Sequence, residues 1–316
     1  GTFIASELEK RLADFKHSES ALVFNTGYMT NLGVLYGLLQ TGDVVFSDEL
    51  NHASIIDGCR ISRCKVVVYK HNDMADLQRL LETEIVTGQR FIVTDGVFSM
   101  DGDIADLPSL AVLKKQFNAC LIVDDAHGVG VIGNDGSGTA SHYGLTDVID
   151  LQVGTLSKAL AAEGGYVAGK KILIDYLINR SRPFIFSTAL APATLAAANA
   201  ALLLLQTQAS KYLDSLRANS RLMRRLLLEG GLNVVEGITP IIPVVIGEAG
   251  LTMQFADRLK SKGILVSGIR PPTVPRGESR LRITVTAAHC EEQLRQAAQI
   301  ITALWQELKH GEKKEG

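Results

Sequence analysis

The chain has few cysteines, no surplus of either charge and no apolar run long enough to cross a membrane. Four cysteines among 316 residues are too few for a disulfide framework, and none has zinc-ligand spacing, so we expect free thiols, no metal site and a cytoplasmic protein. The 32 basic and 34 acidic residues nearly cancel, which argues against nucleic-acid binding. The apolar stretch at 189–205 is rich in alanine and contains Pro192, so it predicts a buried helix rather than a membrane span.

Short apolar runs alternate with helical patterns over the first 190 residues. Because 46% of all residues are hydrophobic, the chain can bury a large core. The predicted strands lie at 21–24, 44–46, 65–69, 91–94, 120–123 and 149–153, and the predicted helices at 7–15, 29–39, from 55, 74–84 and 107–117. Since these strands are continuously apolar, they are typical of a mostly parallel sheet covered on both faces, which predicts a large α/β domain at 1–190.

The pattern changes after residue 190. A predicted basic helix at 211–228 precedes strand-like runs at 241–246, 264–266 and 281–285 and a final helix at 291–308. Strands and helices that no longer alternate one by one indicate an α+β arrangement. We therefore expect a smaller C-terminal α+β domain at 191–316.

One lysine stands in a segment of small and apolar residues, Val153-Gly154-Thr155-Leu156-Ser157-Lys158. A lysine that is partly desolvated has a lowered pKa, which makes its amine a usable nucleophile or base. The alternative is an ordinary surface lysine at the start of a helix. The segment alone does not decide between these readings.

Polar residues follow the ends of several predicted strands. They are Thr26, Asp48, His52, Ser99, Asp124, His127 and Lys158. In open α/β sheets, ligands bind outside the carboxyl ends of the strands. The positions of these residues therefore indicate one shared site.

Each member of this group also has a purely structural alternative. Asp124 could keep a ring nitrogen of a ligand protonated and His127 could reach a neighbouring ring oxygen, or the two could form an Asp turn with a satisfied histidine. The imidazole of His52 could stack on a flat ligand or cap a helix. The segment Thr26-Gly27-Tyr28 could bind an anion with its free N–H groups or be an ordinary helix start. Asp125 is expected to be structural, because successive residues of a strand point apart.

Two further patterns were weighed. Residues 128–133 match G-x-G-x-x-G, but a dinucleotide site needs that motif to open a helix, and helix-breaking residues follow it here. We therefore reject a dinucleotide-dependent oxidoreductase. Arg280, Arg282 and Thr284 share one face of a predicted strand, where an arginine is suited to bind a carboxylate or, alternatively, faces solvent.

Taken together, the motifs resemble the α-oxoamine synthases, which are pyridoxal 5′-phosphate (PLP) enzymes of fold type I. The resemblance covers essentially the whole chain and depends on six ordered segments, of which any one alone would be a weak signal. They are Asn51-His52-Ala53-Ser54, the segment 95–102, the segment 123–128, Gly154-Thr155-Leu156-Ser157-Lys158-Ala159, Phe186-Ser187-Thr188 and Arg280-Leu281-Arg282.

The resemblance implies a role for each candidate residue. It implies that Lys158 forms a Schiff base with PLP, Asp124 pairs with the ring nitrogen, His127 contacts the ring 3-oxygen with Ser99 near it, and His52 stacks on the ring. Thr26, Gly27, Tyr28 and Thr155 would hold the cofactor or its phosphate. Thr188 would reach the phosphate of a neighbouring subunit, which implies a homodimer with shared sites. Arg282 would bind the amino-acid carboxylate.

The implied reaction joins an amino acid to an acyl thioester of CoA or of acyl carrier protein, with loss of CO₂, to give an α-oxoamine. Segments 51–60, 71–73 and 269–275 most resemble the branch that serves biotin biosynthesis, with the glycine-using branch close behind. Alanine or glycine, and pimeloyl or acetyl thioester, both stay open. A catalytically silent partner subunit of the same fold is a further hypothesis, although such a subunit is expected to lack the lysine.

Two departures from the family pattern are expected to matter. The family usually has an N-terminal arm before the position of Gly1, and we expect this sequence to lack it. The family commonly has glycine at the position of Ala161. The extra methyl group is expected to crowd the turn after Lys158 or to alter its backbone.

Overall fold

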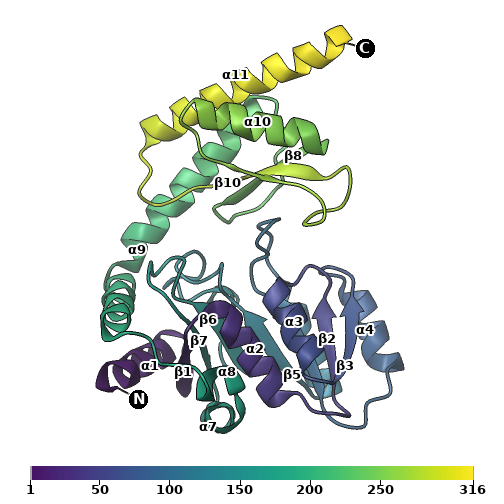
Figure 1. The fold of residues 1–316 in the computed structure, drawn as a ribbon, viewed down its shortest axis with the longest axis vertical. Helices are drawn as coiled ribbons and strands as arrows, with labels where there is room; N and C mark the ends of the chain where they lie inside the picture. Colours follow the sequence, from purple (N-terminus) through teal and green to yellow (C-terminus); the bar gives the residue numbers. More distant parts are fainter. Residues whose placement is uncertain (1, 316) are drawn as a thin grey trace. The chain divides into compact units, whose positions relative to one another are not determined.

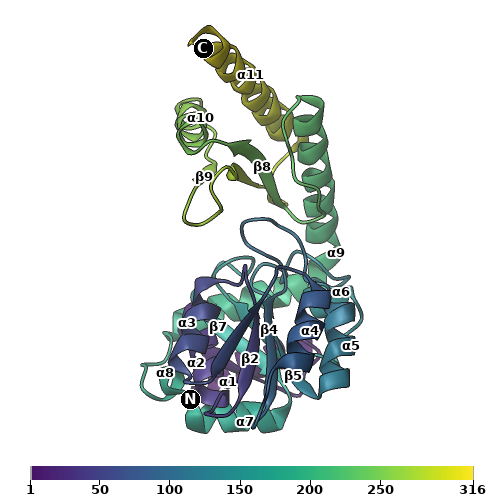
Figure 2. The same ribbon diagram turned by 90° about the vertical axis from the view of Figure 1, so that its right-hand side faces the viewer.

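The computed structural model describes residues 2–315, with side chains up to Lys309, and forms two compact units. The first unit comprises the residues up to 98 together with 104–210, and the second comprises 99–103 and the residues from 211 onward. Figures 1 and 2 show the elements of each unit from two directions. None of the helices in the described part of the chain has the length and apolarity that crossing a membrane requires.

The first unit contains a seven-stranded sheet in the order β1-β7-β6-β5-β4-β2-β3. Its strands are β1 (Ser20–Phe24), β2 (Val44–Asp48), β3 (Lys65–Tyr69), β4 (Arg90–Asp95), β5 (Ala119–Asp124), β6 (Leu151–Thr155) and β7 (Gly165–Gly169). Its helices are α1 (Phe3–Phe15), α2 (Gly27–Leu38), α3 (Ala53–Ile61), α4 (Met74–Thr83), α5 (Leu107–Phe117), α6 (Thr139–His142), α7 (Lys171–Arg180) and α8 (Arg182–Ile185).

Helices cover both faces of this sheet, which explains why the strands are continuously apolar. In β2, Val45 packs into the core layer that contains Ile55 of α3, whereas its neighbours Val44 and Phe46 pack into the layer that contains Leu77 of α4. Successive side chains of a strand point to opposite faces, so both faces need apolar residues here. Figure 2 shows α2 and α3 on one side of the strands and α4 and α5 on the other.

The prediction of a mostly parallel sheet is confirmed, with one reversed strand. β7 is antiparallel to both of its neighbours, β1 and β6. The connection from β6 to β7 is too short for the crossover that a parallel pair needs. The sequence analysis missed β7 because its glycine-bounded sequence, Gly165-Tyr166-Val167-Ala168-Gly169, lacks a long apolar run.

The second unit contains a three-stranded antiparallel sheet in the order β8-β10-β9, with helices packed on it. The elements are β8 (Ile241–Gly247), α10 (Ala249–Ser261), β9 (Ser267–Ile269), β10 (Ser279–Thr284) and α11 (Glu291–Glu315). The predicted strand at 264–266 is wrong, because β9 begins at Ser267. Ile264 and Val266 pack against the core of this unit without joining a ladder, so their alternation reflects packing rather than strand pairing.

Helix α9 (Pro192–Glu229) belongs to both units and is interrupted at Gln208, whose φ of −132° and ψ of 22° are not helical. Its first part, with Leu195 and Leu202, packs into a core cluster with Leu8 of α1 and Tyr166 of β7. The units therefore divide after residue 210 rather than after 190, where the sequence analysis placed the boundary. The change of composition near 190 marks a helix, not the end of a unit.

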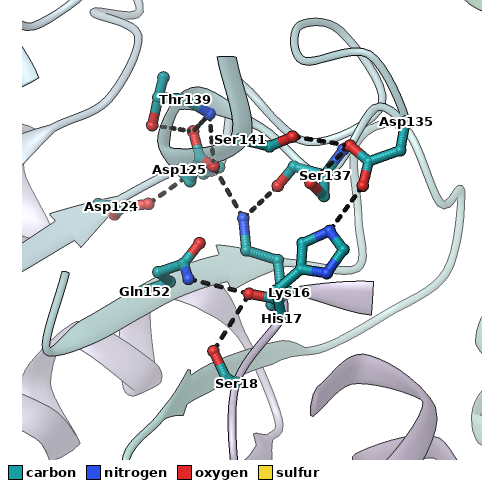
Figure 3. A network of polar contacts seen from close by, with 11 residues as sticks. Lys16, His17, Ser18, Asp124, Asp125, Asp135, Ser137, Thr139, Ser141 and Gln152 are labelled. Atoms are coloured by element: carbon teal, nitrogen blue, oxygen red, sulfur yellow. Dashed lines mark hydrogen bonds and ion pairs between the residues drawn. The ribbon is translucent and has the colours of Figure 1, made fainter. Parts of the chain in front are cut away.

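A buried ion pair anchors the turn that follows β5 (Figure 3). Lys16, directly after α1, is fully buried, and its Nζ lies 2.9 Å from Oδ2 of Asp125 and donates to the carbonyl oxygen of Ser137. Asp125 also accepts hydrogen bonds from the N–H and the hydroxyl of Thr139, the latter at 2.9 Å. This confirms the prediction that Asp125 is structural. The pair fixes both ends of the loop between Asp125 and Thr139.

The connection between β6 and β7 is a tight turn around Lys158. The N–H of Leu156 donates to the carbonyl of Gly164 at 3.0 Å, and the N–H of Ala161 donates to the carbonyl of Lys158 at 3.1 Å. Ala161 has a φ of 48°, in the left-handed region that favours glycine. Ala161 therefore strains the backbone of this turn, because the turn requires a left-handed conformation that a Cβ atom disfavours.

We predict that Lys16→Met lowers the free energy of unfolding by about 3–5 kcal/mol, because it leaves the buried Asp125 carboxylate without its cation. Urea unfolding followed by circular dichroism measures the loss. Lys171→Met is the control, because Lys171 forms an exposed ion pair with Asp175 at 2.7 Å and its loss should cost far less. Equal losses in the two variants would contradict this account of the buried pair.

We predict that Ala161→Gly stabilises the protein by up to about 1 kcal/mol. The relief of left-handed strain, about 1–2 kcal/mol for an L-residue, exceeds the entropy that glycine adds to the unfolded chain, about 0.4–1 kcal/mol. Thermal unfolding measures the change, with Ala201→Gly in the regular helix α9 as the control that should destabilise. A lower melting temperature for Ala161→Gly would show that the turn is not strained.

Candidate functional site

The carboxyl ends of neighbouring strands bring several predicted residues to one edge of the sheet. β4 ends at Asp95, β5 at Asp124 and β6 at Thr155, and Asp95 and Asp124 are paired in register. The starts of α2 and α3 follow β1 and β2 at the same edge, because all five of these connections leave a strand at its carboxyl end. A shared site at this edge is thus built from separate segments of the chain.

Asp124 lies at the centre of this edge and is only 6% exposed. Its Oδ2 accepts a hydrogen bond from Nδ2 of Asn31 at 2.5 Å, and its Oδ1 accepts one from the N–H of Ala126 at 3.0 Å. Burial raises the pKa of this carboxyl above its ordinary value, while the bond from Asn31 and the positive charges of Lys158 and His52 act to lower the pKa. Those charges act on Asp124 because all three side chains lie at the same edge.

His52 is joined to Asp124 through two polar side chains. His52 is the N-cap of α3, and its Nδ1 lies 2.7 Å from Oγ of Ser54. Nδ2 of Asn31 donates to that same oxygen at 2.9 Å as well as to Asp124. His52 therefore does cap a helix, as the alternative interpretation predicted. The same contacts keep its imidazole close to the polar side chains around Asp124.

Asn31 and Asp95 are two site residues that the sequence did not predict. Asn31 is buried within α2, and the available signal was a polar side chain inside an otherwise apolar helix. Asp95 ends β4 just as Asp124 ends β5, so its position in the chain was the signal. Its Oδ2 accepts a hydrogen bond from the N–H of His52 at 2.9 Å.

The start of α2 forms a cradle of N–H groups beside a hydroxyl. Thr26 is the N-cap, and its Oγ1 accepts from the N–H of Met29 at 3.0 Å. The N–H groups of Gly27 and Tyr28 have no acceptor within the helix, as at any helix start. A Cβ added to Gly27 would lie 3.2 Å from Cβ of Thr155, which is a tight contact, so glycine favours this close approach of the helix to β6. Such a cradle suits a phosphate.

The side chain of Tyr28 points away from the cradle, because its hydroxyl donates to a carboxylate oxygen of Asp57 on α3. Thr155 is buried, and its Oγ1 lies 2.8 Å from Oγ of Ser157. Any contact of Tyr28 with an anion therefore has to come from its backbone N–H. Thr155 and Ser157 add a hydroxyl pair between the cradle and Lys158.

Lys158 and His127 lie in turns at the same edge. Lys158 is exposed in this chain, so the predicted partial desolvation is wrong for the described residues. The reason is that the β6–β7 turn lifts residues 157–159 out of the core. His127 is half-buried in the turn after β5, next to the Asp125 anchor described above.

Three of the predicted residues, Ser99, Arg280 and Arg282, are placed by contacts within the second unit. Ser99 and Arg282 belong to the second unit, where Nε of Arg282 donates to the carbonyl of Ser99 and its Nη1 donates to Oγ1 of Thr284 at 3.0 Å. Burial lowers the pKa of the Arg282 guanidinium. Arg280 is structural, because it is buried and forms ion pairs with Asp101 and Glu278.

Thr188 lies in the first unit, in the exposed segment after α8. Its carbonyl accepts a hydrogen bond from Nδ2 of Asn25 at 2.7 Å, and the residue as a whole is exposed. Residues 128–133 form turns, and Gly130 and Gly133 have φ values of 70° and 87°, so the motif does not open a helix. This agrees with the rejection of a dinucleotide site.

Comparisons with known proteins agree with the resemblance found in the sequence. The family model for class I and II aminotransferases matches residues 1–301. The 8-amino-7-oxononanoate synthase of Lysinibacillus sphaericus is 50% identical over 291 residues, which is 92% of this chain and 75% of that protein. The enzyme of the same name from Geobacter sulfurreducens is 52% identical over 302 residues, or 95% of this chain and 77% of that protein.

Solved structures give the same result. Serine palmitoyltransferase from Sphingomonas wittichii superposes with a TM-score of 0.94 at 31% identity, covering 98% of this chain and 78% of that one. A high-resolution structure of SPT with PLP has the same TM-score, identity and coverage. The 8-amino-7-oxononanoate synthase of Francisella tularensis superposes with a TM-score of 0.83 at 31% identity, covering 98% of this chain and 89% of that one. The chain therefore belongs to the class I and II aminotransferase family and, within it, to the α-oxoamine synthases of fold type I.

Proposed function

We propose that this chain is a PLP-dependent acyltransferase of the 8-amino-7-oxononanoate synthase type, which joins L-alanine to a pimeloyl thioester in biotin biosynthesis. The observation that carries the proposal is the grouping of Lys158, Asp124 and His52 beside the N–H cradle of α2. The chain is 50–52% identical in sequence to three enzymes of that name, which supports the choice of substrates.

The residues at this edge fit PLP. The cradle of Gly27 and Tyr28 N–H groups, with Thr26 and Thr155, offers donors for a phosphate. The buried Asp124 carboxylate suits a cationic ring nitrogen, because a buried charge needs a partner. We assign His127 and Ser99 to the ring 3-oxygen and His52 to the ring face. When bound, PLP supplies an electron sink that stabilises negative charge at the α-carbon of an amino acid.

Each of the chain's residues then has a definite task. The amine of Lys158 would hold the cofactor and would accept the α-proton of the amino acid as general base, a contribution of typically ~10²–10⁴-fold. Asp124 would keep the ring nitrogen protonated, and the hydrogen bond from Asn31 fixes the orientation of the Asp124 carboxylate. Arg282 binds the amino-acid carboxylate, and Thr284 restrains one side of its guanidinium.

We further propose a homodimer in which the exposed Thr188 hydroxyl reaches the phosphate bound by the partner subunit. Sedimentation of the protein with PLP tests this assembly, and a monomer with bound cofactor would contradict it. The cytoplasmic location stays a prediction.

Glycine with an acetyl thioester is the main alternative pair of substrates, as in a glycine C-acetyltransferase. The decisive experiment measures CoA release for alanine and glycine, each combined with pimeloyl-CoA and acetyl-CoA. The proposal expects the alanine and pimeloyl pair to have the highest kcat/KM. No turnover with any pair by a protein that binds PLP would instead favour the catalytically silent subunit.

We predict that Lys158→Ala lowers the rate of CoA release by at least about 10³-fold, because it removes both the attachment point and the general base. The variant should still bind PLP through the cradle and Asp124, as followed by absorbance. Lys170→Ala, which removes an exposed lysine just after β7, is the control and should retain wild-type turnover. Wild-type turnover by Lys158→Ala would remove the lysine from the mechanism.

We predict that Arg282→Ala raises the KM for the amino acid by about 10–100-fold and leaves the KM for the acyl thioester within a few-fold. A charge-assisted hydrogen bond contributes about 1.5–3 kcal/mol, and about 1.4 kcal/mol corresponds to tenfold in affinity. Initial rates at varied concentrations of each substrate separate the two effects. Arg295→Ala on the exposed face of α11 is the control. An unchanged KM for the amino acid would place its carboxylate elsewhere.

A further inference from the structure

A second carboxyl, Asp95, lies beside Asp124 and has received no role. Asp95 ends β4 as Asp124 ends β5, and the two residues are directly paired in the ladder between these strands. The side chain of Asp95 is 6% exposed, the same fraction as that of Asp124. Two carboxyls are therefore buried next to each other at the edge where the site is assembled.

The contacts of Asp95 tie it to His52. Its Oδ2 accepts from the backbone N–H of His52 at 2.9 Å, and its own N–H donates to Oδ1 of Asn51 at 2.8 Å. Asn51 is held in turn by Nδ2 bonds to Oγ of Ser47 and the carbonyl of Val93. This reciprocal pair of bonds fixes the loop after β2 against β4, and with it the N-cap position from which the His52 ring projects.

The charges around Asp95 differ from those around two other buried aspartates, Asp125 and Asp150. Asp125 has Nζ of Lys16 at 2.9 Å, and Asp150 has Nζ of Lys114 at 2.7 Å. Among the described residues no ion pair reaches Asp95. The ionisable groups that act on it are the carboxylates of Asp124 and Asp48 and the cation of Lys158.

We propose that Asp95 is a positioning residue that stays protonated at neutral pH, holding the His52 N–H with one carboxyl oxygen and leaving Asp124 as the ionised carboxylate of the pair. The proposal rests on the function proposed above for the site. Ionising both neighbours would bury two like charges side by side, which a low-dielectric interior disfavours. A neutral carboxyl still has an acceptor oxygen, so the bond to His52 survives protonation.

The hydrogen-bond partners of the two carboxyls explain why Asp124 is the ionised one and Asp95 the protonated one. Asp124 accepts from Asn31 and Ala126, two donors that stabilise a negative charge, whereas Asp95 accepts from one N–H. Burial, followed by the charge of Asp124, raises the pKa of Asp95 well above its ordinary value, against the opposing effects of the His52 N–H and of Lys158. A cationic ring nitrogen of bound PLP beside Asp124 would widen the difference in pKa between the two carboxyls, since it favours the ionised form of Asp124. Asp124 would then be the one negatively charged carboxyl of this pair that faces the PLP ring.

Infrared spectroscopy of the protein without added cofactor tests the proton on Asp95. The difference spectrum of wild type minus Asp95→Asn at pH 7 should contain one carboxylic-acid C=O band. Asp150→Asn is the matched control: Asp150 is 8% exposed but paired with a lysine, so that difference spectrum should contain a carboxylate band instead. A carboxylate band in the Asp95→Asn difference spectrum would overturn the proposal.

PLP titration tests the positioning role. Asp95→Asn keeps an acceptor for the His52 N–H and should bind PLP within about threefold of wild type, whereas Asp95→Ala should bind at least about tenfold more weakly. Equal affinity of the Ala and Asn variants would overturn the positioning role.

If Asp95→Ala does not fold, as judged by circular dichroism, a second measurement takes its place. It follows the absorbance of PLP bound to Asp95→Asn as a function of pH, and this pH profile should match that of wild type. A shifted profile would overturn the proposal, and a wild type that binds no PLP would refute the function while leaving the infrared result interpretable.

Discussion

The structure of the candidate site depends on one geometric constraint, which is that successive residues of a strand point to opposite faces. Asp124 is the last residue of β5 and Asp125 follows it directly, but the two side chains face different surroundings. Asp125 is neutralised by the buried Lys16, which fixes the loop that returns to Thr139. Asp124 faces Asn31 and feels the charges of Lys158 and His52. One strand end therefore supplies both the anchor of the fold and the central charge of the site.

The remaining site residues are placed by strand ends and helix starts rather than by local motifs. β4 and β5 set Asp95 beside Asp124, and the close approach of Gly27 to Thr155 sets the N–H cradle beside the turn that carries Lys158. Because these residues come from separate connections, the site exists only when the sheet is formed. Folding of the sheet and assembly of the site therefore occur together.

Much of this was predictable from the sequence, and what was not has physical reasons. The continuous apolar strands and the polar residues after them predicted the sheet and its edge, since periodicity and strand-end position are local signals. β7 was not predicted because its short sequence is bounded by glycines and lacks a long apolar run, and β9 was predicted too early because Ile264 and Val266 pack without pairing. Asn31 was missed because its two partners are distant in sequence. The exposure of Lys158 depends on a turn that no sequence pattern defines.

The central claim is that Lys158 is the residue to which PLP attaches at this edge of the sheet. Borohydride reduction of the protein mixed with PLP, followed by proteolysis and mass spectrometry, tests this claim most directly. The account predicts that the reduced pyridoxyl adduct lies on the peptide that contains Lys158 and on no other lysine in stoichiometric amount. A stoichiometric adduct on a different lysine, or no adduct in a protein saturated with PLP, would contradict it.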